Sequence, residues 1–292
     1  MSASTGSRGS ASSSARIPPW WSAAGARLVI ARLAMRLRVG AATDTGRVRA
    51  LNEDAYVLRP DQGLFVVCDG MGGAPAGEVA SQLAIDAIVQ QFEDSAHGPA
   101  AERDGGEFLP QTHRLAEAVR RSNQCIYDRA ASDPREAGMG TTVVGVWIGE
   151  HIASVAHVGD SRAYLWHNQR LEALTRDHSL LDSNVLVRAL GREPHVDVEL
   201  AEVPLQPGDY LLLCSDGLTR MVADDDVCRA IVEQREPQRI CDYLIAAANR
   251  NGGADNITVV VVEVADKWWR RLLNGWRRNA TRGHDVEAHP AV

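Results

Sequence analysis

The stretch LFVVCDGMGGAPAGEVAS, residues 64–81, joins a strand-like apolar run to a carboxylate and several glycines. Residues 64–68 are apolar throughout, which is typical of a short strand buried on both faces. Asp69 follows the run directly, and glycines stand at positions 70, 72 and 73. A single Asp-Gly pair is also a common turn signal. The meaning of Asp69 therefore depends on whether other strands end in the same way.

Other apolar runs also adjoin carboxylates. These carboxylates are Glu53 and Asp54 before 55–59, Asp160 after 152–158, Asp216 after 209–214 and Asp255 before 257–264. If the strand ends are scattered, the side chains are solvated turn residues. If the ends converge, the carboxylates repel one another, and divalent cations are needed to offset their charge. Oxygen ligands without His or Cys favour Mg²⁺ or Mn²⁺ over zinc.

The spacing of apolar residues and the helix-start signals predict helices over 77–92, 112–131, 224–234 and 237–249. Strands are predicted over 37–42, 55–59, 64–68, 142–149, 152–158, 162–166, 197–203, 209–214 and 257–264. The helices are grouped in pairs and do not alternate with strands, which favours the α+β class over a doubly wound sheet. We expect two antiparallel sheets packed face to face with helices outside.

Composition excludes several classes of protein. The chain has 292 residues, and its formal charge of −7 argues against a dedicated nucleic-acid binder. No run approaches the roughly 20 apolar residues that span a bilayer, and no secretory signal is evident. The five cysteines form no CxxC pair, so we expect small buried side chains in a reducing compartment. These features predict a cytoplasmic protein.

An ordered set of motifs surrounds the carboxylates. The motifs are TDTGRVRALNEDA (43–55), CDGMGGAPAGEVAS (68–81), MGTTVV (139–144), VGDSRAYL (158–165), LTRDHSL (174–180), SDGLT (215–219) and GGADNITVVVV (252–262). In this order they resemble the metal-dependent Ser/Thr protein phosphatases of the protein phosphatase 2C type, and most of all the bacterial branch. The resemblance covers about residues 37–265. It implies a four-layer α-β-β-α sandwich that hydrolyses phosphoserine and phosphothreonine on proteins.

The resemblance also implies roles for the carboxylates at a core of two Mn²⁺ or Mg²⁺ ions. Asp69 would bridge the two ions, and the backbone carbonyl of Gly70 would be a further ligand. Asp216 and Asp255 would complete the first metal site together with Asp69. The reaction would be the in-line attack of a metal-bridging hydroxide on phosphorus.

Other residues would complete the site. Glu53, through a water, would belong to the second metal site, with Asp54 supporting it. Asp160 would join Asp216 at a third metal site. Arg49 would bind the substrate phosphate, because a planar guanidinium matches two phosphoryl oxygens. The resemblance thus makes Arg49, Asp69 and Asp216 the catalytic residues.

The sequence departs from the family at two places. Met71 stands where many eukaryotic relatives have a histidine that is proposed to protonate the leaving oxygen, and a thioether cannot donate a proton. His157 and His178 are possible substitutes, but their positions in a strand and a turn favour structural roles. The segment after LTRDHSLL is shorter than the helical flap of bacterial relatives, so we expect a more open cleft.

Two other functions fit a chain of this kind less well. A non-catalytic phosphoprotein-binding scaffold on the same fold should have lost ligand carboxylates, and this chain retains them. A two-metal phosphodiesterase would normally have a histidine-rich ligand set. As partners, we expect phosphorylated protein substrates and a counteracting Ser/Thr kinase in bacterial signalling. The chain is expected to be a monomer without nucleic-acid partners.

Composition divides the chain into three regions. Residues 1–36 begin Ser/Gly/Ala-rich and are expected to be unfolded or non-native, with Met35 as a hypothetical start. Residues 37–266 would form the phosphatase domain. In the tail 267–292, segment 267–278 places tryptophans and leucines opposite arginines on a helical projection. That pattern fits either a terminal helix packed on the domain or peripheral contact with the inner membrane face.

Overall fold

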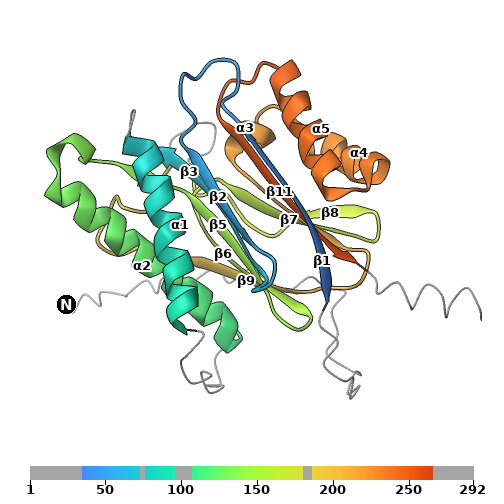
Figure 1. Cartoon of the computed structure of the whole chain (residues 1–292), viewed down its shortest axis with the longest axis horizontal. Helices are drawn as coiled ribbons and strands as arrows, with labels where there is room; N and C mark the ends of the chain where they lie inside the picture. The colour runs from blue at the N-terminus through green and yellow to red at the C-terminus, as the bar shows by residue number, and fades with distance from the viewer. Residues whose placement is uncertain (1–34, 73–75, 96–106, 180–185, 266–292) are drawn as a thin grey trace, which may run out of the picture. The chain divides into compact units, whose positions relative to one another are not determined.

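The computed structural model describes residues 35–72, 76–95, 107–179 and 186–265 (Figure 1). In chain order the elements are β1 (Arg36–Asp44), β2 (Asp54–Arg59), β3 (Leu64–Met71), α1 (Ala76–Ser95), α2 (Pro110–Ser132), η1 (Pro134–Glu136), β4 (Gly140–Thr141), β5 (Val143–Ile148), β6 (Ile152–Val158), β7 (Arg162–His167), β8 (Arg170–Ala173), β9 (Glu199–Pro204), β10 (Tyr210–Cys214), α3 (Asp216–Thr219), α4 (Asp224–Gln234), α5 (Pro237–Arg250) and β11 (Ile257–Ala265). Every predicted helix and strand is present. The short elements η1, β4, β8 and α3 were not predicted.

Two antiparallel sheets form the centre of the fold. One sheet has the strand order β1-β11-β10-β7-β8. The other has the order β2-β3-β5-β6-β9, and β4 pairs with β3 beside this path. All of these strand pairs are antiparallel, which confirms the predicted α+β class.

The central strands are buried on both faces, which explains their continuous apolar runs. In β3, Leu64 and Val66 belong to the core beneath α1 and α2, whereas Phe65 and Val67 belong to the core between the two sheets. Alternate residues of a strand point to opposite faces, so one apolar run serves two cores. Strand β11 divides its valines between the inter-sheet core and the core beneath α4 and α5 in the same way.

The helices cover the outer faces of the sheets. Helices α1 and α2 pack on the sheet that contains β3, and α5 packs on β1 and β11 of the other sheet, with α4 beside it (Figure 1). Helix α2 shows the reason. Leu115, Val119 and Ile126 recur on one helical face and are fully buried. The layers are therefore helix, sheet, sheet and helix, as expected.

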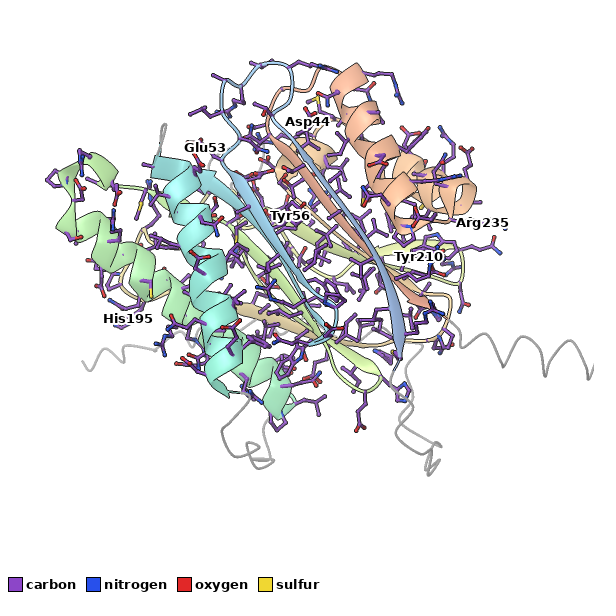
Figure 2. The ribbon with its side chains drawn as sticks, in the orientation of Figure 1. Asp44, Glu53, Tyr56, His195, Tyr210 and Arg235 are labelled. Atoms are coloured by element: carbon purple, nitrogen blue, oxygen red, sulfur yellow. The ribbon has the colours of Figure 1, made fainter. Side chains whose placement is uncertain are left out.

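The antiparallel pairing brings several strand ends to one edge of the sandwich. The end of one antiparallel strand and the start of its neighbour lie side by side. Thus Asp54, which starts β2, is paired with Asp69 near the end of β3. Figure 2 shows Glu53, just before β2, and Asp44, at the end of β1, at this edge. Tyr210, the first residue of β10, lies away from this edge. This edge carries the candidate site.

Some predictions concern residues outside the described ranges. These are the N-terminal extension up to residue 34, most of the shortened segment at 180–185, and the tail from 266 onward. Among the helices that the structure describes, none is both long and apolar enough to cross a bilayer.

The cysteines meet the expectation only in part. All five are free, and Cys68, Cys214 and Cys241 are buried. Cys125 is exposed on α2 and Cys228 is partly exposed on α4, so the prediction of uniformly buried cysteines is wrong for these two. Both lie on helices, which turn part of their surface to solvent.

Candidate metal centre

A cavity of about 1240 Å³ lies where strand ends from both sheets meet. Seven of the eight predicted site residues line it: Arg49, Glu53, Asp69, Gly70, Asp160, Asp216 and Asp255. The eighth, Asp54, is not a lining residue, but it is the cross-strand partner of Asp69. Directly paired residues on neighbouring strands project to the same face of the sheet. The structure therefore gathers all of the predicted carboxylates at one place.

Backbone hydrogen bonds fix Asp69 near the end of β3. Its N–H donates to Thr142 Oγ1 at 3.0 Å, and its carbonyl oxygen accepts from Thr141 Oγ1 and from Thr142 N, both at 2.9 Å. The next residue is Gly70, where α1 approaches the backbone of β3 closely. A Cβ at this position would lie 2.1 Å from the carbonyl oxygen of Gly77. The glycine after Asp69 is thus required by the packing of α1 against the strand end.

Asn256 holds the loop that carries Arg49 and Glu53. Its Oδ1 accepts from the Glu53 N–H at 2.8 Å. Its Nδ2 donates to the carbonyl oxygens of Thr45 at 2.9 Å and Leu51 at 2.8 Å. Asn256 is buried, so these bonds satisfy both ends of its amide away from solvent. The residue before β11 therefore sets where the loop at 45–53 lies.

Asp54 lies behind the cavity and is held by hydroxyl groups. Its Oδ2 accepts from Ser215 Oγ at 2.8 Å and from Thr258 Oγ1 at 2.7 Å. Both donors come from the other sheet region, so Asp54 joins the two sheets at the base of the site. Burial raises the pKa of Asp54 to about 6, and the two hydroxyl hydrogen bonds oppose this shift.

The carboxylates fall into two groups that differ in their cationic partners. Among the described residues, every ion pair of the cluster involves Asp160, Asp216 or Asp255, which we call the arginine side. Arg220 Nη2 contacts Asp216 Oδ2 and lies 3.7 Å from Asp160 Oδ2, and Arg220 Nη1 lies 3.6 Å from Asp255 Oδ2. Arg49 Nη2 lies 2.8 Å from Asp255 Oδ2.

Glu53, Asp54 and Asp69 form the second group, which we call the unpaired side. The described residues give these three carboxylates no ion pair with an arginine, lysine or histidine. Burial raises the pKa of Asp69 well above its ordinary value, and the neighbouring carboxylates Asp54 and Asp216 raise it further. Negative charge is therefore least compensated around Asp69.

The pKa values of two carboxylates on the arginine side, Asp160 and Asp216, are also raised. Burial raises the pKa of Asp216 to about 7, and the nearby Asp160 adds to this shift, while Arg220 opposes it. Burial likewise raises the pKa of Asp160, with Arg220 again opposing. Carboxylates gathered in this way are stable in the ionised form only if further positive charge is supplied.

Unpartnered buried oxygens indicate where that charge would bind. Glu53 Oε1, Asp54 Oδ1 and Asp216 Oδ1 are buried, and the described residues offer them no hydrogen-bond partner. Buried polar atoms are rarely left without partners, and each such atom needs an explanation. The donors are all carboxylate oxygens, Gly70 lines the same cavity, and oxygen donors of this kind suit Mg²⁺ or Mn²⁺. The residues present therefore fit divalent cations.

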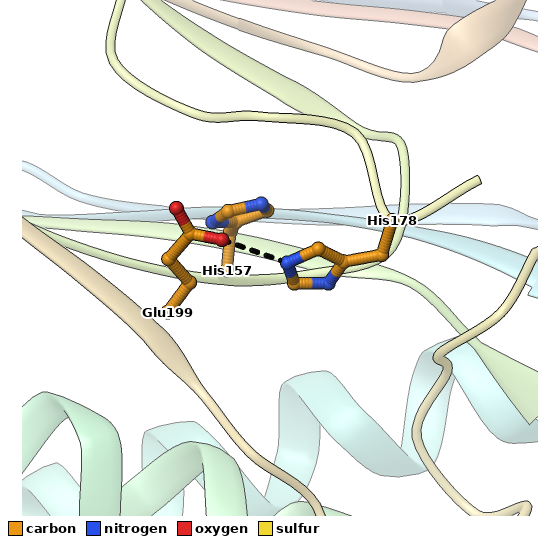
Figure 3. A group of neighbouring side chains, drawn as sticks. All are labelled: His157, His178 and Glu199. Carbon is orange, nitrogen blue, oxygen red and sulfur yellow. Dashed lines mark hydrogen bonds and ion pairs between the residues drawn. The ribbon is translucent and has the colours of Figure 1, made fainter. Parts of the chain in front are cut away.

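His157, His178 and Glu199 form a second cluster, shown in Figure 3. The imidazole rings stack with centroids 4.5 Å apart, and His178 Nε2 donates to Glu199 Oε2 at 2.9 Å. His178 Nδ1 accepts from the Gly159 N–H at 3.2 Å, so this nitrogen carries no proton. A metal ion on Nε2 would then require a doubly deprotonated ring, which argues against a metal site.

The cluster has a positioning role instead. His157 Nε2 donates to the Arg176 carbonyl oxygen at 2.9 Å, and burial lowers the pKa of His157, which favours its neutral form. The hydrogen bonds join segment 176–178 to β9 and to Gly159, the residue before Asp160. Neither histidine lines the cavity. The structure thus places neither one where it could protonate a leaving group.

Two residues of the centre were not predicted from the sequence. Arg220 follows the SDGLT motif, and its spacing of four residues from Asp216 was the available signal, since residues four apart lie on one face of a helix. Asn256 stands inside the GGADN motif, but its role depends on contacts with a loop about two hundred residues away. No local pattern reveals contacts of that kind.

The protein phosphatase 2C family model matches residues 45–244. The chain is 37% identical to the serine/threonine phosphatase stp of Listeria monocytogenes over 242 residues, which cover 76% of this chain and 93% of the relative. It is 35% identical to the serine/threonine protein phosphatase PstP of Mycobacterium tuberculosis over 256 residues, 81% of this chain and 47% of the relative.

A solved structure with a similar fold is the catalytic domain of PstP in complex with 2 manganese ions. It superimposes with a TM-score of 0.69 at 34% sequence identity, and the match covers 79% of this chain and 99% of that one.

Proposed function

The chain belongs to the protein phosphatase 2C family of serine/threonine phosphatases. On that premise we propose that it hydrolyses phosphoserine and phosphothreonine on proteins with two divalent cations bound in the cavity. The observation that carries this proposal is the set of buried, unpartnered oxygens of Glu53, Asp54 and Asp216 around Asp69. When bound, Mn²⁺ or Mg²⁺ would supply an activated water as the nucleophile and positive charge for the phosphoryl oxygens.

The chain's own residues hold the centre in place. Asp69 belongs to the unpaired side, and its backbone is fixed by Thr141 and Thr142. Asp216 and Asp255 would serve the same core together with the Gly70 carbonyl. Glu53, supported by Asp54, would orient water at the second cation. These assignments rest on the shared cavity and on the donor chemistry.

Arg49 would bind the substrate phosphate. Its side chain is 51% exposed and lines the cavity, and among the described residues its one ionic partner is Asp255. A guanidinium in this place can offer two parallel N–H donors to a phosphoryl group. Met71 also lines the cavity and has no proton to donate, so we propose that solvent water protonates the leaving oxygen.

The finer features of the function follow from the same proposal. The substrates would be phosphorylated proteins, and the activity would reverse a Ser/Thr kinase in the cytoplasm. The phosphatase domain would comprise residues 37–266 and act as a monomer. For the tail 267–278 the two alternatives are packing on the domain and contact with the inner membrane face, and we further propose that Met35 is used as a start. Co-sedimentation with anionic liposomes, with and without the tail, and the intact mass of the native protein test these two points.

The activity itself is tested by phosphate release from a phosphothreonine peptide and from p-nitrophenyl phosphate, with Mn²⁺ and with EDTA. We expect hydrolysis of both monoesters with Mn²⁺ and none with EDTA. Metal binding without any turnover would favour the phosphoprotein-binding scaffold. Turnover of a diester such as bis-p-nitrophenyl phosphate, without turnover of monoesters, would favour a phosphodiesterase.

A further inference from the structure

Arg220 is a basic side chain set among the carboxylates of the centre. It lines the cavity, and its guanidinium lies within ion-pair distance of all three carboxylates of the arginine side, Asp160, Asp216 and Asp255. Its side chain is 33% exposed, so most of its surface is covered by the protein. Surface arginines normally keep the guanidinium in water. Arg220 instead places its charge inside the site.

The short helix α3 fixes this position. The Arg220 N–H donates to the Asp216 carbonyl oxygen at 2.9 Å, so the backbone of the two residues is joined by one helical turn. Residues four apart lie on the same helical face, which directs the Arg220 side chain to the Asp216 carboxylate. Asp216 itself follows the buried strand β10. The guanidinium is therefore tethered to the same turn that delivers a metal-binding carboxylate.

The two oxygens of Asp216 have different surroundings. Oδ2 contacts Arg220, whereas Oδ1 is buried and has no hydrogen-bond partner in the part of the chain that the structure describes. Oδ1 is thus available to a cation on the Asp69 side, and Oδ2 is already paired. Asp160 is buried as well, and within the described part of the chain its carboxylate forms an ion pair with Arg220. A divalent cation between Asp160 and Asp216 would have to displace the guanidinium or lie directly beside it.

We propose that the Arg220 guanidinium takes the place of a third divalent cation between Asp160 and Asp216, so that the chain binds two cations and no more. This inference rests on the proposed function for the location of those two cations. The charges agree with it. Two divalent cations together with Arg49 and Arg220 balance the six carboxylates of the cluster, Glu53, Asp54, Asp69, Asp160, Asp216 and Asp255. A third divalent cation would add uncompensated positive charge beside a fixed guanidinium.

The inference is an alternative to the expectation that Asp160 and Asp216 form a third metal site, and counting the bound ions decides between the two. It also assigns Asp160 a partner within the chain. Because the charge of Arg220 is covalently attached, it is present at every metal concentration. The metal requirement of the enzyme should therefore be met in one phase, without a further rise in activity at high Mn²⁺.

The test counts bound Mn²⁺ on the full chain by equilibrium dialysis at millimolar Mn²⁺, followed by elemental analysis of metal and sulfur. The wild-type chain and Arg220→Lys should each bind two ions. Arg220→Asp and Arg220→Asn should each bind a third, because the cationic side chain is gone. The double variant Arg220→Asp with Asp160→Asn should return to two. Arg229→Asp, at an exposed arginine paired with Asp226 on α4, is the matched charge control and should bind two.

Three ions on the wild-type chain would overturn the inference, whatever the variants do. Two ions on both Arg220→Asp and Arg220→Asn, with circular dichroism showing that they are folded, would also overturn it. The ion count can fail independently of the proposed phosphatase activity, so the two proposals are distinguishable. Two bound ions without phosphatase turnover would support the role of Arg220 and contradict the proposed activity, whereas three bound ions with turnover would do the reverse.

Discussion

The unpaired side and the arginine side of the cavity hold equal numbers of carboxylates, but they offset the negative charge differently. On the unpaired side, Asp54 accepts hydrogen bonds from two hydroxyls, and Asp69 lies near other carboxylates without a cationic partner among the described residues. On the arginine side, Arg220 and Arg49 supply two guanidinium groups. On the proposal made above, clustering of carboxylates does not by itself determine where a cation binds. The positive charge that the chain already places among the carboxylates would determine it.

This comparison predicts that substitutions on the two sides have unequal effects, with the largest effect at Asp69. Asp69→Asn removes the carboxylate at the least compensated position, so we expect a loss of about 100-fold or more in kcat and weaker Mn²⁺ binding. Asp160→Asn should lower kcat by less than about tenfold, because Arg220 still offsets the charge of the neighbouring Asp216 carboxylate. Steady-state kinetics and Mn²⁺ titration measure both effects.

Asp61→Asn, at an exposed turn residue, is the control and should leave kcat unchanged. Equal losses for Asp69→Asn and Asp160→Asn would show that the two sides are equivalent and would contradict the comparison.

The next largest effect should come from Arg49 at the rim. Arg49→Ala removes a phosphate-binding guanidinium without removing a metal ligand, so KM should rise about tenfold while kcat changes less. Arg47→Ala is the matched control, since Arg47 is exposed on the same loop and does not line the cavity. A fall in kcat at constant KM in Arg49→Ala would place Arg49 in the chemical step instead.

The raised pKa values predict a pH dependence of stability that divalent cations reverse. Burial raises the pKa of Asp54 to about 6 and that of Asp216 to about 7. Between about pH 4 and these values the folded chain binds more protons than the unfolded chain, so the free energy of unfolding falls as pH rises. In EDTA, Tm should therefore be lower by about 5 °C at pH 8 than at pH 5.

Mn²⁺ binds the ionised carboxylates and should raise Tm more at the higher pH than at the lower one. Differential scanning calorimetry with EDTA and with Mn²⁺ provides the comparison, because groups away from the site titrate equally in both. Parallel pH profiles in the two solutions would show that these carboxylates are not the cation ligands.

A smaller effect is expected at the hydroxyls that hold Asp54. Thr258→Val keeps the shape of the side chain and removes one donor to Asp54 Oδ2. The lost hydrogen bond is worth about 1 kcal/mol, so the apparent Kd for Mn²⁺ should rise about threefold to tenfold. Thr43→Val is the control, because Thr43 contacts the Thr258 hydroxyl but not Asp54. Isothermal titration calorimetry would detect the difference, and equal Kd values in the two variants would argue against the role of Asp54.

The sequence predicted the parts of this site that depend on local pattern. The apolar runs before Asp69 and Asp216 and after Asp255 identify both the strands and the carboxylates at their ends, because burial on both faces leaves a continuous signature. Elements of two to four residues, such as β4 and α3, contain too few residues to show a period. Their existence depends on tertiary contacts, as does the position of Asp216 at the first turn of α3.

The compensation of charge could not be predicted from the sequence. Arg220 reaches Asp160 and Asp255 only because β7, α3 and β11 meet at one edge, and Asn256 acts on a loop far away in the chain. The same limit applies to Gly70. A side chain at this position would clash with the Gly77 carbonyl oxygen on α1, and that contact depends on the fold. Convergence of distant segments is a property of topology, and a pattern of residues reveals it only when the fold is known.

The most direct test of the difference between the two sides is the anomalous diffraction of Mn²⁺ in a crystal of this chain. Data collected on either side of the manganese absorption edge locate each ion independently of the protein chemistry. We predict two anomalous peaks beside Asp69, between Glu53 and Asp255, and no peak between Asp160 and Asp216, where the Arg220 guanidinium lies. Peaks absent from the Asp69 side, or an ion in place of the guanidinium, would contradict the account.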